Sequence, residues 1–156
     1  MDPAHPTAAV TGAAVVGAAV VAGASVVVGA GGVGSAIAAS LAAAGIAAIT
    51  LFDRHAESAE ALGDRLRQHY PVLDVATGSN DPAGHDLVVN ATPMGMNDGD
   101  PMPMDVARID PQAFVGEVVM KAEMTAFLKA AQARLGVLSD ARGLYPRLTA
   151  RENITY

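Results

Sequence analysis

A glycine-rich stretch, VVVGAGGVGSAIA at residues 26–38, has the residue types and spacing of a nucleotide-binding turn. Its glycines show Gly-x-Gly-x-x-Gly spacing, in which the first allows a tight turn and the second lets backbone N–H groups approach a pyrophosphate. The third lets a helix pack close to the preceding strand, and the N-terminus of that helix favours an anion. We therefore expect a dinucleotide to bind at Gly29, Gly31, Gly32, Val33 and Gly34.

An acidic residue lies where the ribose of a dinucleotide would need one. Asp53 follows an apolar run, about twenty positions after the glycines, and a carboxylate there can accept a hydrogen bond from a ribose 2′-hydroxyl. The neighbouring Arg54 could instead pair with a 2′-phosphate or stack on adenine. Because the carboxylate would repel a 2′-phosphate, we expect NAD as the cofactor, with NADP as the alternative. The competing interpretation, glycines that only turn a corner and an Asp53 that caps the helix starting near Glu57, explains the paired match less well.

Apolar runs and amphipathic segments alternate along the chain and predict the elements that position these residues. Gly45 is placed to end the first helix, and Ala61, Leu62 and Leu66 are expected on one side of the second. Prolines 93, 101, 103 and 111 predict loop and short helix over 93–112. We predict an α/β protein with a Rossmann-like three-layer fold and a mainly parallel sheet. Strands are predicted at 25–28, 47–52, 73–77, 86–92 and 114–120, and helices at 32–44, 57–70 and 123–136.

The length of 156 residues suits one domain, and the hydrophobic content of 51% suits a sheet covered on both faces. We expect an apolar lead-in at 1–24, an NAD(P)-binding domain at 25–140 and an irregular tail at 141–156. The net charge of -6 argues against a nucleic-acid partner, because such affinity comes largely from Lys and Arg. The chain has no cysteine, which excludes disulfides and thiolate metal sites and fits a reducing compartment, so we expect the cytoplasm.

A long uncharged segment raises the question of a membrane span, because no Asp, Glu, Lys or Arg lies within residues 6–52. Residues 11–31 alone are long enough to cross a bilayer. Their Ala and Gly residues are only weakly lipophilic, no basic region precedes them, and they continue directly into the glycine motif. We therefore expect a small-residue helix packed on the sheet, followed by a buried strand, and no membrane span.

Three segments in order, GAGGVGSAIA at 29–38, VVNATPMGM at 88–96 and FVGEVVMKAEMTAFLKAAQARLG at 114–136, resemble shikimate dehydrogenase and its quinate/shikimate dehydrogenase-like relatives. The likeness covers roughly residues 25–136. It implies a nicotinamide-binding domain in which Val118 and Met120 approach the nicotinamide ring and Thr125 shapes the start of the following helix. It also implies a cofactor groove after a strand, lined by Asn90, Thr92, Pro93, Met94 and Gly95.

Elementary geometry agrees with that groove, because ligands of open parallel sheets lie beyond the carboxyl ends of the strands. Taken alone, the 90–96 loop is equally typical of a proline-rich turn whose methionines fill the core. Met120 also suits a plain core position.

The resemblance implies an NAD(P)-binding domain of an oxidoreductase that moves a hydride between nicotinamide and a ring alcohol such as shikimate or quinate. Family members carry a substrate domain before the nucleotide domain, with a Lys and an Asp that handle the hydroxyl, and nothing in this sequence corresponds to it. The only lysines are Lys121 and Lys129, so the catalytic residues stay unassigned. The alternative is a non-catalytic dinucleotide-binding module or truncated product lacking the substrate domain. A separate substrate-domain partner or a homo-oligomer would be the expected assembly.

Other candidate residues carry weaker signals. Asp98, Asp100 and Asp105 suit turns rather than a cation site, since no set of ligands with calcium spacing accompanies them. We expect no metal. His55, His69 and His85 are scattered and are expected at the surface.

Overall fold

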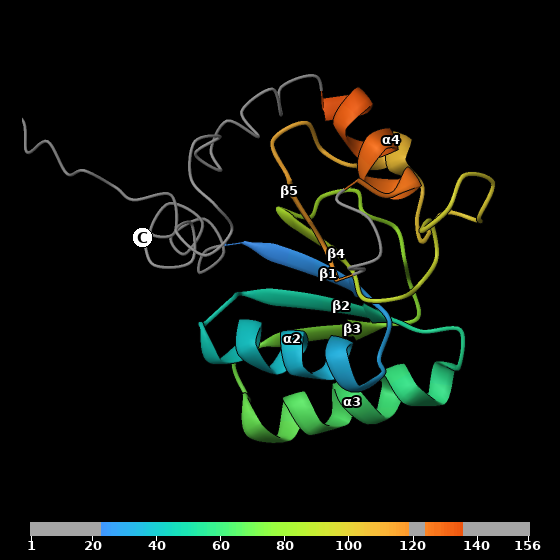
Figure 1. The fold of residues 1–156 in the computed structure, drawn as a ribbon. Helices are drawn as coiled ribbons and strands as arrows, with labels where there is room; N and C mark the ends of the chain where they lie inside the picture. The colour runs from blue at the N-terminus through green and yellow to red at the C-terminus, as the bar shows by residue number, and fades with distance from the viewer. Residues whose placement is uncertain (1–22, 119–123, 136–156) are drawn as a thin grey trace, which may run out of the picture.

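The computed structural model describes residues 23–118 and 124–135, and it has an α/β architecture (Figure 1). All pairings in its five-stranded sheet are parallel, and the strand order is β3-β2-β1-β4-β5. The strands are β1 (Ala24–Val28), β2 (Ala48–Phe52), β3 (Asp74–Thr77), β4 (Leu87–Asn90) and β5 (Phe114–Glu117). The helices are α2 (Gly32–Ala43), α3 (Ala56–His69) and α4 (Ala126–Leu135), with a short 3-10 helix η1 (Val106–Arg108).

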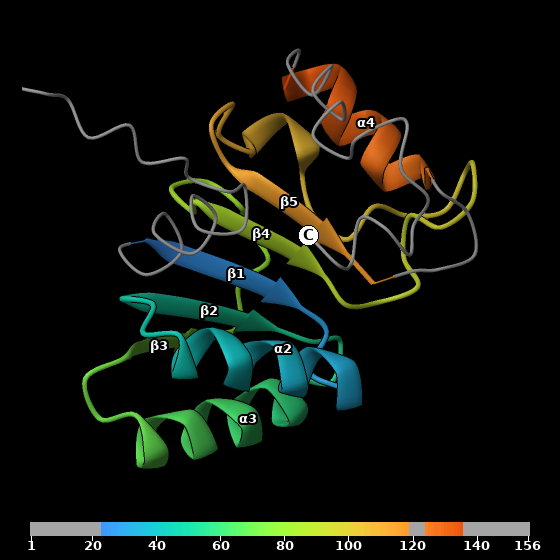
Figure 2. The same ribbon diagram turned by 60° about the vertical axis from the view of Figure 1, so that its left-hand side comes forward.

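Helices cover both faces of the sheet, as the prediction of a three-layer fold requires. Figure 2 shows α2 and α3 together on one face and α4 on the other, above β4 and β5. Side chains alternate between the faces along each strand, so Val27 packs toward α2 and α3 while Val26 and Val28 pack toward α4. Phe127 of α4, fully buried, fills the second core. The predicted fold class is confirmed.

The strand order determines where a ligand can bind. The chain runs outward from β1 to β2 and β3 and then returns to the other side of β1 to form β4 and β5. Connections after β1 and β4 therefore leave in opposite directions, and in open α/β sheets the ligand-binding crevice lies at such a switch point, beyond the carboxyl ends of the strands. The glycine turn follows β1 and the 91–95 loop follows β4, so both predicted parts of the site lie at that crevice.

The sequence periodicity located the elements to within a few residues. Gly45 ends α2 with a φ of 85°, and its N–H donates to the carbonyl of Ala42. The prediction for Ala61 was wrong: Ala61 is exposed, because the buried stripe of α3 runs along i, i+3, i+4 and i+7 positions. That stripe consists of Ala59, Leu62, Gly63 and Leu66.

Within the two described ranges, no helix is both long enough and apolar enough to cross a membrane. Most of the uncharged lead-in lies outside the described residues, as do Met120, Lys121 and the segment from residue 136 onward. The domain bounds drawn from the sequence remain predictions.

Candidate functional site

Two of the motif glycines are required by the packing of the turn itself. Gly29 has a φ of 107°, and a Cβ there would lie 2.8 Å from the carbonyl oxygen of Ala91. A Cβ on Gly34 would lie only 1.8 Å from the carbonyl oxygen of Gly29. These two positions therefore let β1, the first turn of α2 and the loop after β4 approach one another.

The other two glycines are not required by the fold. A Cβ at Gly31 or Gly32 would meet no atom within 4 Å, and both residues are exposed. Gly31 has extended backbone angles, with φ -70° and ψ -169°, which any residue can adopt. The open space at this backbone is what an approaching ligand would occupy.

The partial positive charge at the N-terminus of α2 is not balanced by a capping side chain or by an acidic residue in the first turn. Its N-cap residue is Gly31, which has no side chain to accept a hydrogen bond, and no acidic residue lies in the first turn. The first N–H groups of a helix have no intrahelical acceptor, and the helix dipole adds partial positive charge. The arrangement fits an anion such as a phosphate, with the half-exposed side chain of Val33 beside it.

Asp53 joins the end of β2 to the glycine turn. Its Oδ2 accepts a hydrogen bond from the backbone N–H of Ala30 at 2.7 Å, and its Oδ1 accepts one from the N–H of His55 at 2.9 Å. Partial burial acts to raise the pKa of Asp53, but these two backbone donors and the charges of His55 and Arg54 outweigh it, so the pKa lies below its usual value. The carboxylate is therefore ionised beside the turn.

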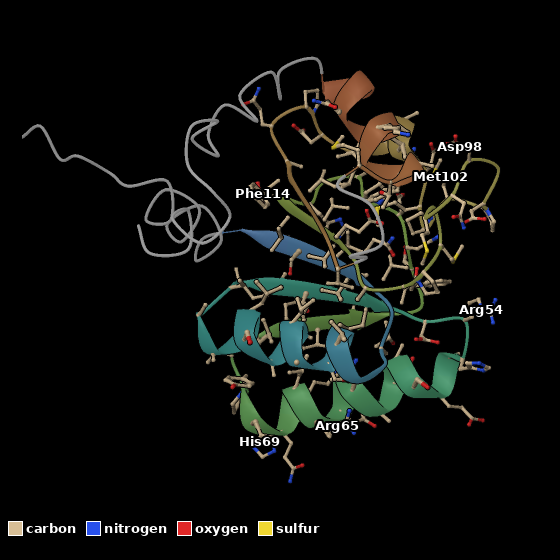
Figure 3. All side chains as sticks on the ribbon, in the orientation of Figure 1. Arg54, Arg65, His69, Asp98, Met102 and Phe114 are labelled. Atoms are coloured by element: carbon tan, nitrogen blue, oxygen red, sulfur yellow. The ribbon has the colours of Figure 1, made fainter. Side chains whose placement is uncertain are left out.

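This geometry argues against a capping role for Asp53. The N-cap of α3 is His55, and no side chain caps that helix. Arg54 is exposed and points outward from the loop after β2 (Figure 3). Its guanidinium is free to approach a group bound next to Asp53.

The loop after β4 is held by a buried amide. Asn90 is fully buried, and its Oδ1 accepts hydrogen bonds from the backbone N–H of Thr92 at 3.0 Å and from the Thr92 hydroxyl at 2.7 Å. Its Nδ2 donates to the carbonyl of Met94 at 2.9 Å. Asn90 thus supports the loop from below, while Pro93 is exposed and Thr92 and Met94 are half-buried.

Three predicted parts of the site meet at this edge of the sheet. The loop lies against the glycine turn, because a Cβ on Gly29 would be 2.9 Å from the Thr92 Cγ2. Val118 follows β5 and donates its backbone N–H to the carbonyl of Asn90 at 3.2 Å. The turn, the 91–95 loop and Val118 are therefore contiguous, whereas Met120 lies outside the described residues.

Sequence reasoning missed Glu117, the last residue of β5. Its Oε1 accepts from Asn90 Nδ2 at 2.9 Å, and its Oε2 accepts from the hydroxyl of Thr125. The sequence signal that could have revealed this role is the position of Glu117, an acidic residue inside the apolar run FVGEVVM. Thr125 has its expected role at the helix start, since its Oγ1 accepts the N–H of Leu128 at 3.1 Å.

The weaker candidates fall outside this site. Asp100 and Asp105 accept backbone N–H groups within turns, as predicted from the sequence. His55 and His69 are exposed, as expected, and His85 is half-buried. Its Nε2 is hydrogen-bonded to Thr50 Oγ1 and its Nδ1 to the carbonyl of Ala83, both at 3.0 Å. Among the described residues, no group of His, Asp or Glu side chains is arranged to hold a metal ion.

Comparison with known proteins identifies relatives of this chain. The family model described as shikimate / quinate 5-dehydrogenase matches residues 16–95. Among solved structures, the quinate dehydrogenase of Corynebacterium glutamicum in complex with NAD is 36% identical, with a TM-score of 0.63 over 72% of this chain and 42% of that one. No curated protein sequence matches the chain.

Two further solved structures share the fold at lower sequence identity. The shikimate 5-dehydrogenase of Thermus thermophilus, in complex with NADP(H) and shikimate, is 27% identical with a TM-score of 0.60, covering 73% of this chain and 41% of that one. A ligand-free 5-ketofructose reductase of a Gluconobacter species is 25% identical with a TM-score of 0.64, covering 86% and 55%. The chain thus spans between about two-fifths and just over half of the length of these relatives.

Proposed function

The chain belongs to the shikimate / quinate 5-dehydrogenase family, and from that premise we propose that it binds NAD(P) as the nucleotide-binding part of an oxidoreductase. The observation that carries this proposal is the uncapped N-terminus of α2 behind an open glycine backbone, with an ionised carboxylate at the neighbouring strand end. This combination supplies donors for a pyrophosphate and an acceptor for a ribose hydroxyl.

The order of the strands supports the binding mode that we propose. We place the pyrophosphate against Gly31, Gly32, Val33 and Gly34, and the adenine ribose at Asp53. The nicotinamide half then lies along Thr92, Pro93 and Met94, with Val118 toward the ring. Met120, for which the family resemblance implies the same role, lies outside the described residues. A bound nicotinamide would supply the acceptor or donor of a hydride.

We propose NAD as the preferred cofactor. The lowered pKa of Asp53 keeps a negative charge where NADP would place its 2′-phosphate. Arg54 opposes this preference, because its exposed guanidinium can approach the same position. Solved relatives hold either cofactor, NAD in the quinate dehydrogenase and NADP(H) in the Thermus enzyme, so the balance between these two side chains decides.

The proposed activity is hydride transfer between nicotinamide and a ring alcohol, with shikimate or quinate as the substrate. The alternative is a non-catalytic dinucleotide-binding module, since the residues brought together at the described site are assigned to the cofactor and none of them to an alcohol substrate. In an assembly with a separate partner that carries the substrate site, or in a homo-oligomer, a dinucleotide-binding module could still take part in the oxidoreductase activity. The cytoplasm is the proposed compartment, since a chain without cysteine fits a reducing one.

Backbone amide resonances measured during an NAD titration test the proposed binding mode. We expect the signals of Gly31, Gly32 and Val33 to shift in a saturable manner, because their N–H groups would meet the pyrophosphate. Arg65 and His69, on the outer side of α3 (Figure 3), provide the internal control and should not move. Unchanged glycine-turn signals in a folded protein, or shifts confined to α3, would contradict the proposal.

A further inference from the structure

We propose that Glu117 is a positioning residue that sets the geometry of the nicotinamide subsite, an inference that rests on the proposed function. Among the described residues, its carboxylate makes no hydrogen bond to the glycine turn or to Asp53. Instead it joins the end of β5 to the loop after β4 and to the start of α4. No motif in the sequence pointed to this role.

The first link is forced by the orientation of the Asn90 amide. The N–H of Thr92 can only donate, so the atom of Asn90 that faces it must be Oδ1. The carbonyl of Met94 can only accept, so the atom that faces it must be Nδ2. The amide therefore cannot be reversed, and its second N–H requires an acceptor, which is Glu117 Oε1 at 2.9 Å.

The second link is the hydroxyl of Thr125, whose oxygen already accepts a hydrogen bond from α4. Thr125 is buried, and its Oγ1 accepts the N–H of Leu128 at the first turn of α4. Its own hydrogen is directed at Glu117 Oε2. A carboxylate has two oxygens that can each accept a hydrogen bond, so Glu117 satisfies the amide and the hydroxyl together.

The helix and the loop also contact each other directly. The N–H of Phe127 donates to the carbonyl of Gly95 at 3.0 Å, and a Cβ on Gly95 would lie 2.8 Å from the Phe127 Cβ. Val118 completes the unit by donating its N–H to the carbonyl of Asn90. The strand end, the loop and the helix start thus form one connected wall of the crevice.

The place of this wall in the sheet assigns it to the nicotinamide half. Asp53 follows β2, which lies on one side of β1, whereas the wall follows β4 and β5 on the other side. A dinucleotide whose pyrophosphate sits on the turn after β1 spans both sides. With the adenine ribose at Asp53, the opposite half of the ligand must lie against the wall that Glu117 holds.

Paired titrations of the full chain with NADH and ADP-ribose test this inference. ADP-ribose contains the adenine half and the pyrophosphate, while NADH adds the reduced nicotinamide, whose fluorescence emission reports its surroundings. The variants are Glu117→Ala, which removes both acceptors, and Glu117→Gln, which retains one. Thr125→Val removes the hydroxyl at nearly constant volume, and Thr125→Ser is its matched control because it keeps the donor and the cap.

We expect Glu117→Ala to weaken NADH binding about tenfold, the equivalent of one lost hydrogen bond, and to abolish the change in emission on binding. ADP-ribose affinity should stay within about twofold, because Glu117 hydrogen-bonds the loop after β4 and the start of α4 rather than Asp53 or the glycine turn. Glu117→Gln and Thr125→Val should give intermediate losses of the same kind, and Thr125→Ser should match the unmodified protein.

Equal weakening of both ligands, or NADH binding and emission that survive Glu117→Ala, would overturn the inference. If Glu117→Ala does not fold, Glu117→Gln and Thr125→Val decide by the same comparison. Failure of the proposed function looks different, since the unmodified protein would then bind neither ADP-ribose nor NADH.

Discussion

Asp53 and Ala30 are joined by a hydrogen bond of 2.7 Å, from the backbone N–H inside the glycine turn to the carboxylate at the end of β2. The two parts of the motif are thus in direct contact. The side chain proposed to receive the ribose also fixes the backbone proposed to receive the pyrophosphate. A change at Asp53 should therefore affect both affinity and cofactor preference.

Replacing Asp53 with Asn tests the preference for NAD. The amide is isosteric but carries no charge, so it removes the repulsion of a 2′-phosphate while Arg54 remains to attract it. We expect the affinity for NADP relative to NAD to rise about tenfold, or ~1.4 kcal/mol. Dissociation constants of both cofactors, measured at one salt concentration, provide the comparison. Tighter binding of NADP than NAD by the unmodified chain would refute the preference.

The Gly34→Ala substitution should destabilise the fold without any ligand. Its Cβ would lie 1.8 Å from the carbonyl oxygen of Gly29, and backbone must shift to accommodate it. We expect a loss of roughly 3 kcal/mol in the free energy of unfolding. Gly32→Ala is the matched control in the same turn, because its Cβ meets no atom within 4 Å. Equal urea midpoints for the two variants would show that Gly34 is not required by packing.

Stability should depend on pH through Asp81. The Arg108 guanidinium donates to both oxygens of this carboxyl, and with the Ala83 N–H it lowers the pKa of Asp81 to about 2. A carboxyl whose pKa is lower when folded stabilises the protein above its ordinary pKa, and that contribution disappears as the pH falls toward 2. The difference in urea midpoint between the unmodified chain and Asp81→Asn should therefore be larger near about pH 6 than near about pH 2.5. A difference independent of pH would contradict this.

Turnover of shikimate or quinate by this chain alone is not expected. Hydride transfer from a secondary alcohol needs a group that takes the hydroxyl proton, and Lys121 and Lys129 are the only lysines. Lys129 lies exposed on α4. We expect NAD to bind without steady production of NADH when shikimate is added. Steady production that Lys121→Ala abolishes would make Lys121 the base.

The sequence predicted what depends on local periodicity and on glycine chemistry. The apolar run before Gly29 and the helical spacing after it located the strand, the turn and α2, because such patterns reflect the burial of one face. Open space at Gly31 and crowding at Gly34 match the separate roles that the motif gives them.

The missed features depend on contacts between distant segments. Asn90 and Glu117 are 27 residues apart in the chain, and the parallel pairing of β4 with β5 brings their side chains together. His85 is half-buried because the loop before β4 reaches Thr50 of β2. Neither pairing leaves a periodic signal, so a single sequence does not reveal it.

Calorimetric titration of NAD into Gly31→Val tests the central claim most directly. The protein itself leaves the space at Gly31 open, so the added side chain should obstruct only a ligand that approaches the turn. Ala39→Val, at an exposed position of α2, is the matched control, and thermal unfolding confirms that both variants fold. We predict that the unmodified chain and Ala39→Val bind NAD with similar affinity, while Gly31→Val binds at least about tenfold more weakly. Undiminished binding by a folded Gly31→Val protein, or no binding by the unmodified chain, would contradict the glycine turn as the dinucleotide site.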